Sequence, residues 1–122
     1  MSKRDSILLL GDILESISKI QKYTDEMDFE SFVEDDKTID AVVRNFEIIG
    51  EAANRLDPDF KTAYPEIDWK RIKGFRNRIV HDYFGIDYEI VWDIVKNNLD
   101  ELKEWFEHIN RKINSDSDWK KI

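Results

Sequence analysis

Residues 36–56, DKTIDAVVRNFEIIGEAANRL, carry the pattern that decides the fold. Apolar side chains recur along this stretch at three- and four-residue steps and form one stripe: Ile39, Val42, Val43, Phe46, Ile49, Ala53 and Leu56. That spacing predicts an amphipathic helix that buries one face. Asp36 or Thr38 is its expected N-cap, and the pair Asp57-Pro58 is expected to end it.

A second face of the same predicted helix is charged. Arg44, Glu47, Glu51 and Arg55 follow one another at three- and four-residue steps, the spacing of ion pairs on a helix surface. Two carboxylates one turn apart can also bind a metal, but the flanking arginines favour salt bridges. Gly50 costs about 1 kcal/mol relative to alanine inside a helix, so we expect another helix to cross closely there.

The same periodicity recurs on both sides of this stretch. The expected elements are a first helix over residues 5–27 capped by Asp5 or Ser6, a short helical turn within 28–36, a connection over 59–67, a third helix from its cap Asp68 to an exit at Phe84-Gly85, and a last, longest helix capped by Asp87. Together they predict an all-α fold, an up-and-down bundle of four main helices plus short helical turns. One domain is expected over residues 1–114, with a polar tail at 115–122.

Composition limits the possible functions. The chain has 122 residues and no cysteine, which excludes disulfides, thiolate zinc sites and a cysteine nucleophile. The early apolar run at residues 7–10 is too short for a signal peptide or a membrane span. We therefore expect a soluble, cytoplasmic protein that has no contact with a membrane.

Basic residues gather in one segment of an otherwise acidic chain. The net charge is −8, yet residues 70–81 hold five basic side chains and no acidic one: Lys70, Arg71, Lys73, Arg76 and Arg78. An acidic body with one basic face would direct RNA or DNA to that face and keep it away from the rest. The alternative is that this basic helix pairs with acidic neighbours in the fold.

Residues 76–83, RNRIVHDY, concentrate the chemistry of the chain. His81 can take or give a proton near neutral pH, and arginine can stabilise a charged phosphorus centre. RNA supplies its own nucleophile, the 2′-hydroxyl, so such a site needs no metal and no cofactor. Neither histidine lies in a zinc-binding pattern. His108 falls between Glu107 and Ile109 and is expected to be solvated.

Helix geometry suggests that this segment forms only half of a site. On a straight helix Asn77 and His81 share a face, whereas Arg76 and His81 are separated by a rotation of about 140°. Two copies related by a two-fold axis near the third helix would bring Arg76 of one close to His81 of the other, which predicts a homodimer. The structural alternative is that the helix dipole merely favours His81 near a helix C-terminus.

Three features together resemble the HEPN superfamily, and specifically the HepT-like toxins of HEPN–MNT toxin–antitoxin pairs. The first is Arg76, four residues, His81, one residue and Tyr83; the second is the polar Asn77 directly after the arginine. The third is the phrase RNFEIIGEAAN at residues 44–54, set in an acidic four-helix domain of this length. The likeness extends over about residues 5–113.

The resemblance implies a metal-independent endoribonuclease with Arg76 and His81 as its catalytic pair. Asn77 would orient the pair, Arg78 would support it, and the active site would be composite, formed by two subunits. Tyr83 would receive AMP from a partner nucleotidyltransferase, the antitoxin of a type VII-like system. Further RNA contacts are expected from the exposed basic residues Lys70, Arg71 and Lys73. The alternative is a non-catalytic helical subunit that docks a nucleotidyltransferase or binds a nucleotide.

Overall fold

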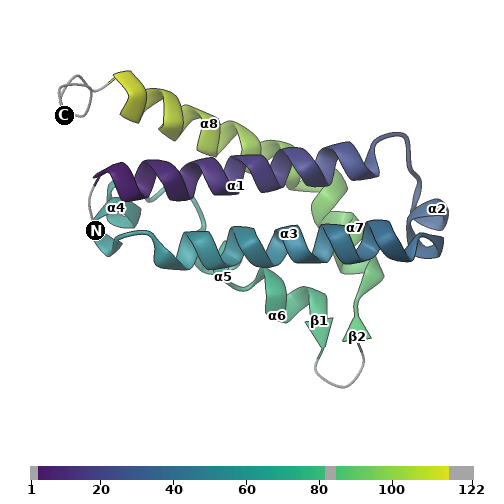
Figure 1. Cartoon of the computed structure of the whole chain (residues 1–122). Coiled ribbons are helices and arrows are strands. Elements are labelled where there is room, and N and C mark those ends of the chain that lie inside the picture. Colours follow the sequence, from purple (N-terminus) through teal and green to yellow (C-terminus); the bar gives the residue numbers. More distant parts are fainter. Residues whose placement is uncertain (1–2, 82–84, 116–122) are drawn as a thin grey trace.

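The computed structural model describes residues 3–81 and 85–115, and these parts of the chain are mostly helical (Figure 1). The elements are α1 (Lys3–Thr24), α2 (Phe29–Glu34), α3 (Asp36–Arg55), α4 (Pro58–Ala63), α5 (Trp69–Lys73), α6 (Phe75–Ile79), β1 (Val80–His81), β2 (Gly85–Ile86), α7 (Tyr88–Asn97) and α8 (Leu99–Ser115). The predicted all-α class is confirmed. A pair of two-residue strands is an addition that the sequence did not predict.

Helices α1 and α3 lie side by side and form the centre of the bundle (Figure 1). Helix α8 packs against α1, while α5 and α6 pack against α3. The interior is filled by the apolar stripes of these helices, with Ile13, Phe46, Ile49 and Phe106 almost fully enclosed. Within the described residues there is no helix that combines the length and the apolar character needed to cross a membrane.

Aspartate side chains begin most of the helices. They accept hydrogen bonds from backbone N–H groups of the first turn, which have no partner inside the helix. Asp68 caps α5 and Asp87 caps α7, as predicted. The cap of α3 is Asp35, which accepts from the Thr38 N–H at 3.0 Å, so the expected cap at Asp36 or Thr38 was wrong by one to three residues.

Several helix boundaries differ from the prediction, and the expected third helix is divided at Gly74 into α5 and α6. The first helix ends at Thr24 rather than near residue 27, and Glu26 adopts a left-handed φ of 62° just beyond it. The expected last helix is divided at Asn98 into α7 and α8, where asparagine has low helix propensity. The expected connection after α3 contains α4, because Pro58 occupies its first turn and Asp57 caps it. Proline after a capping residue begins a helix as readily as it ends the one before.

Gly50 confirms the expected close crossing. A Cβ atom built at this position would lie 3.4 Å from the backbone oxygen of Ile72 and 3.8 Å from that of Lys73, both in α5. The absence of a side chain therefore lets α3 and α5 approach closely. This crossing places the basic segment beside the middle of α3.

The caps of α2 and α3 predict a loss of stability in acid. The Ser31 N–H donates to Asp28 and the Thr38 N–H donates to Asp35, and these backbone hydrogen bonds hold the pKa of both carboxyl groups below the ordinary value of 3.8. A lowered folded pKa gives stability that is present above about pH 4 and is lost as the pH falls through the folded pKa. Thermal unfolding of wild type and of the double variant Asp28→Asn/Asp35→Asn, from pH 6 down to pH 3, measures this. Asparagine still caps, so the variant should lose less of its melting temperature in acid than wild type; equal losses would contradict the expectation.

Candidate functional site

Residues 76–81 of the Arg76–Tyr83 segment span a helix and a strand rather than one helix. Arg76 and Asn77 belong to α6, and His81 lies in β1, where it pairs with Gly85 of β2. Tyr83 lies outside the described residues, as do the side chains of Arg76 and His81. The predicted exit of the third helix at Phe84-Gly85 is wrong, because α6 ends at Ile79.

Local chemistry explains where α6 ends. Ile79 and Val80 are consecutive β-branched residues, which favour extended backbone over helix. The carbonyl of Ile79 then accepts a hydrogen bond at 2.7 Å from the N–H of Asp87, which closes the base of the hairpin. Gly85 has a φ of +77°, a left-handed conformation that glycine adopts without a steric penalty.

This geometry removes the rotation argument for a dimer. That argument assumed a continuous helix from Arg76 to His81, in which the two residues face different sides. Because His81 follows the end of the helix, neither the 140° separation nor the stacking of Asn77 on His81 applies. The hairpin that carries His81 instead projects away from the bundle on the side of α5 and α6 (Figure 1).

Aromatic packing anchors α6 to the centre of the bundle. Phe75 is 1% exposed and its ring meets that of Phe46 in α3 edge-on, with centroids 5.6 Å apart. Ile79 is fully buried, whereas Asn77 is exposed and Arg78 is half-buried. The described apolar side chains of α6 therefore face the bundle, and Asn77 faces away from it.

The basic residues before Arg76 do not share one face. Lys70, Arg71 and Lys73 are all exposed, as expected. The guanidinium of Arg71 donates to the side-chain oxygen of Asn98 at 3.0 Å, at the junction of α7 and α8. Lys73 lies on the other side of α5, toward α3. The fold therefore engages Arg71 in a helix contact and separates it from Lys73.

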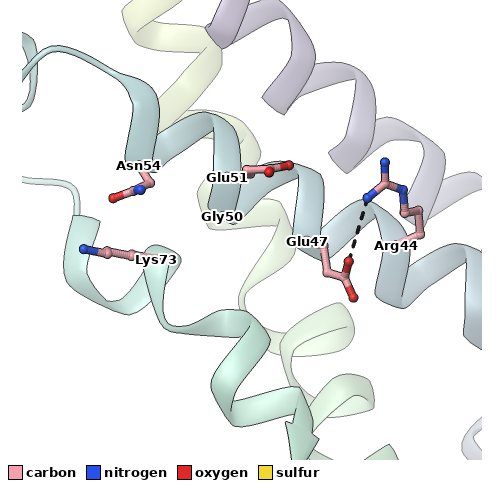
Figure 2. A pocket seen from close by; sticks show the side chains of 6 residues that line it. All are labelled: Arg44, Glu47, Gly50, Glu51, Asn54 and Lys73. Atoms are coloured by element: carbon pink, nitrogen blue, oxygen red, sulfur yellow. Dashed lines mark ion pairs between the residues drawn. The ribbon is translucent and has the colours of Figure 1, made fainter.

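A polar hollow lies between α3 and α5, and we call it the α3–α5 hollow (Figure 2). Its volume is about 330 Å³, and the residues that line it are Arg44, Glu47, Gly50, Glu51, Asn54 and Lys73. Arg44 and Glu47 approach to 3.8 Å, so the predicted ion pair is confirmed for these two residues. Sequence reasoning did not predict that Asn54 and Lys73 line the same hollow as the charged face of α3. The signal was Gly50, which marked where the second helix crosses.

Among residues 3–81 and 85–115, no group of three or more His, Asp or Glu side chains is placed to hold a metal ion. His108 is exposed on α8, as predicted. Among the described residues, the α3–α5 hollow and the α6–β1 segment are neighbours, and together they hold most of the candidate functional residues.

A family model described as ribonuclease HepT-like matches residues 13–109, which includes the α3–α5 hollow and the whole Arg76–Tyr83 segment. The chain belongs to the HepT-like ribonuclease family. The resemblance inferred from the sequence is thereby confirmed.

Several proteins of known name are similar to this chain over most of its length. Two proteins of Methanocaldococcus jannaschii carry the name "Putative RNase". The first is 45% identical to this chain, and the match covers 85% of this chain and 87% of that protein. The second is 41% identical, and the match covers 85% of this chain and 95% of that protein. The "Probable ribonuclease HepT" of Thermococcus cleftensis is 41% identical over 89% of this chain and 99% of its own. No solved structure matches the chain.

Proposed function

We propose that this protein is a metal-independent endoribonuclease toxin that cuts cellular RNA in the cytoplasm and is inactivated by AMP transfer to Tyr83. The observation that carries the proposal is membership of the HepT-like ribonuclease family over residues 13–109, together with the intact Arg76, His81 and Tyr83 pattern inside that range. The position of β1 supports it, because this strand, which contains His81, lies at the edge of the bundle (Figure 1).

The chemistry assigns one role to each residue of the pair. His81 takes the proton of the RNA 2′-hydroxyl as that oxygen attacks the adjacent phosphorus. Arg76 stabilises the negative charge that accumulates on the phosphoryl oxygens. The bond to the 5′-oxygen breaks, that oxygen leaves with a proton, and a 2′,3′-cyclic phosphate remains. Asn77 and Arg78 orient the pair and the phosphate.

Two subunits complete the site in this proposal. The family resemblance supports a homodimer whose seam lies near α6 and the hairpin, so that Arg76 of one copy meets His81 of the other. A hairpin that projects from a compact bundle is accessible to a second copy. A two-fold axis at this place would create two equivalent sites.

Regulation uses the hydroxyl of Tyr83 in the same proposal. A nucleotidyltransferase of the MNT type transfers AMP to Tyr83, forming a phosphodiester bond to the tyrosine oxygen and releasing pyrophosphate from ATP. The added group is bulky and negatively charged, so it repels an RNA phosphate and occupies space beside His81. Toxin and antitoxin would then form a type VII-like pair.

Cleavage of RNA in the presence of EDTA tests the activity. Purified wild type, freed of its partner, is expected to shorten RNA and to leave 2′,3′-cyclic phosphate ends, which mass spectrometry of the products identifies. Circular dichroism and light scattering establish that the sample is folded and dimeric. Intact RNA under those conditions would exclude the nuclease and leave the non-catalytic partner subunit as the reading.

Co-expression with a nucleotidyltransferase of the MNT type tests the modification. Intact-mass measurement should show wild type heavier by one or more AMP units, and Tyr83→Phe should show no such addition. The control is Tyr88→Phe, because Tyr88 is an exposed tyrosine close in sequence. An AMP addition that survives Tyr83→Phe, or one that Tyr88→Phe abolishes, would assign the modification elsewhere.

A further inference from the structure

The α3–α5 hollow has charged groups that the fold does not use. Arg44 and Glu47 form only a loose contact at 3.8 Å, and the Arg44 side chain is 66% exposed, so this pair adds little stability. Glu51 and Lys73 take part in no ion pair within the described residues. Figure 2 shows Lys73 and Asn54 close together at one end and Arg44 with Glu47 at the other. Two cations and two carboxylates therefore surround an open space.

The hollow lies directly beside the proposed cleavage site. Lys73 precedes Arg76 by three residues, and the edge-on contact of Phe46 with Phe75 holds the start of α6 against the turn of α3 that carries Glu47. An RNA strand that places a phosphodiester bond between Arg76 and His81 must continue past one side of this segment. The hollow is the space available on the α3 side.

Size and charge define what the hollow can hold. A volume of about 330 Å³ is at the lower end of the range for small-molecule sites, which suits one nucleotide rather than a folded RNA element. Lys73 and Arg44 offer positive charge to phosphate groups. Glu51 and Glu47 offer hydrogen-bond acceptors, and Asn54 offers both a donor and an acceptor.

We propose that the α3–α5 hollow is a nucleotide subsite of the RNA substrate, which reads a base that carries an exocyclic amine. Lys73 and Arg44 contact the phosphates on either side of this nucleotide, and the carboxylate of Glu51 accepts a hydrogen bond from the base. This inference rests on the proposed function only in taking RNA as the substrate, not in requiring cleavage.

The selectivity follows from the acceptor-only character of a carboxylate. Adenine, cytosine and guanine each present an amine that donates to such a group, as glutamate accepts from the cytosine amine in nucleic-acid recognition. Uracil has a carbonyl oxygen where cytosine has its amine, and its one donor on that edge, N3–H, lies between two carbonyl oxygens that repel the carboxylate. A Glu51→Gln substitution supplies an amide that donates and accepts, so it removes the reason for rejecting uracil.

Binding to RNA that cannot be cleaved tests the proposal separately from the activity. The probes are short, fluorescently labelled 2′-O-methyl oligonucleotides of adenosine, of cytidine and of uridine, because the methyl group removes the nucleophile. Fluorescence anisotropy with wild type is expected to give binding of the adenosine and cytidine probes about tenfold tighter than of the uridine probe. Glu51→Gln should bring the three affinities within about twofold of one another.

A second variant examines the phosphate contact. Lys73→Ala should weaken the binding of all three probes to a similar degree. It should also reduce the slope of log affinity against log salt concentration by about 0.7, the value for one phosphate contact on a single strand. The matched controls are Lys22→Ala and Glu104→Gln, exposed residues on α1 and α8 that change the charge by the same amount away from the hollow. Both should leave affinity and base preference as in wild type.

The outcomes separate this subsite from the nuclease proposal. If Lys73→Ala binds no more weakly than Lys22→Ala, or if Glu51→Gln keeps the discrimination against uridine, the subsite is overturned even where RNA is cut. If wild type binds none of the probes while folded, the subsite is likewise overturned, and the hollow faces a protein instead. If the predicted affinities hold but unmodified RNA stays intact, the subsite stands and the cleavage proposal fails.

Discussion

Replacement of His81 by alanine is expected to slow RNA cleavage by roughly a hundred- to ten-thousandfold, the contribution of a positioned acid–base group. Arg76→Ala should cost roughly a hundred- to a thousandfold, because it removes the group that stabilises charge on the phosphoryl oxygens. Initial rates on a labelled RNA in EDTA measure both effects. His108→Ala is the matched control, since His108 is the other histidine and is exposed on α8. A His81→Ala enzyme that keeps wild-type rates would remove His81 from the mechanism.

Mixing the two inactive variants extends this result to the composite site. In a dimer of one Arg76→Ala and one His81→Ala subunit, one site has lost both groups and the other has Arg76 and His81 intact. Random exchange of subunits should therefore restore about a quarter of wild-type activity. If each site were built within one subunit, the mixed dimer would contain no intact pair. Absence of recovery, with exchange verified by differently tagged subunits, would then place the pair in a single chain.

The second large effect concerns stability. Phe46→Ala is expected to lower the free energy of unfolding by about 3–5 kcal/mol, as for other buried aromatic residues. Phe46 is 1% exposed, and its ring contacts that of Phe75, so the substitution leaves a cavity between α3 and α6. Urea denaturation measures the change. A loss of this size is a large fraction of the stability of an ordinary domain.

An exposed residue gives the matched control for Phe46. Leu8 on α1 is 60% exposed, so Leu8→Ala should change the free energy of unfolding by less than about 0.5 kcal/mol. Cleavage by the folded fraction of Phe46→Ala should also fall, because Phe75 positions the start of the helix that carries Arg76. A Phe46→Ala protein as stable as Leu8→Ala would show that α6 is anchored elsewhere.

Much of the fold follows from local sequence signals. The stripe from Ile39 to Leu56 predicted α3, and Asp68 and Asp87 were identified as caps. Gly50 indicated that another helix crosses α3 closely, and the structure shows that this helix is α5. These features depend on side chains that are close in sequence, and helix periodicity reports them directly.

The remaining features depend on competition between alternatives of similar energy. A proline after Asp57 can stop one helix or begin the next, and here it does both. The backbone after Ile79 can continue a helix or enter a strand, and the hydrogen bond from Asp87 contributes to the second outcome across seven intervening residues. A periodicity pattern within a short stretch of sequence does not reveal hydrogen-bond partners that lie outside that stretch.

The candidate site likewise has one part that the local sequence predicts and another part that only the packing of helices brings together. Arg76, His81 and Tyr83 were found in the sequence because they lie within one octapeptide. The α3–α5 hollow joins Asn54 on α3 to Lys73 on α5, and only the packing of the two helices relates them. Arg71, expected among the RNA contacts, also donates a hydrogen bond to Asn98, and helix periodicity does not predict this contact.

In the proposed control by AMP transfer to Tyr83, the pairing of His81 with Gly85 would have a kinetic consequence. Only residues 82–84 connect the two paired positions, so Tyr83 is two residues from His81 and within about 7–8 Å of it along the chain. A nucleotide bonded to Tyr83 is therefore a tethered inhibitor, present at an effective concentration that a short linker sets in the millimolar range. Such an inhibitor is not diluted when the cell grows or when free nucleotide falls. Inactivation would then last as long as the covalent bond, independent of the affinity of the hollow or the hairpin for AMP.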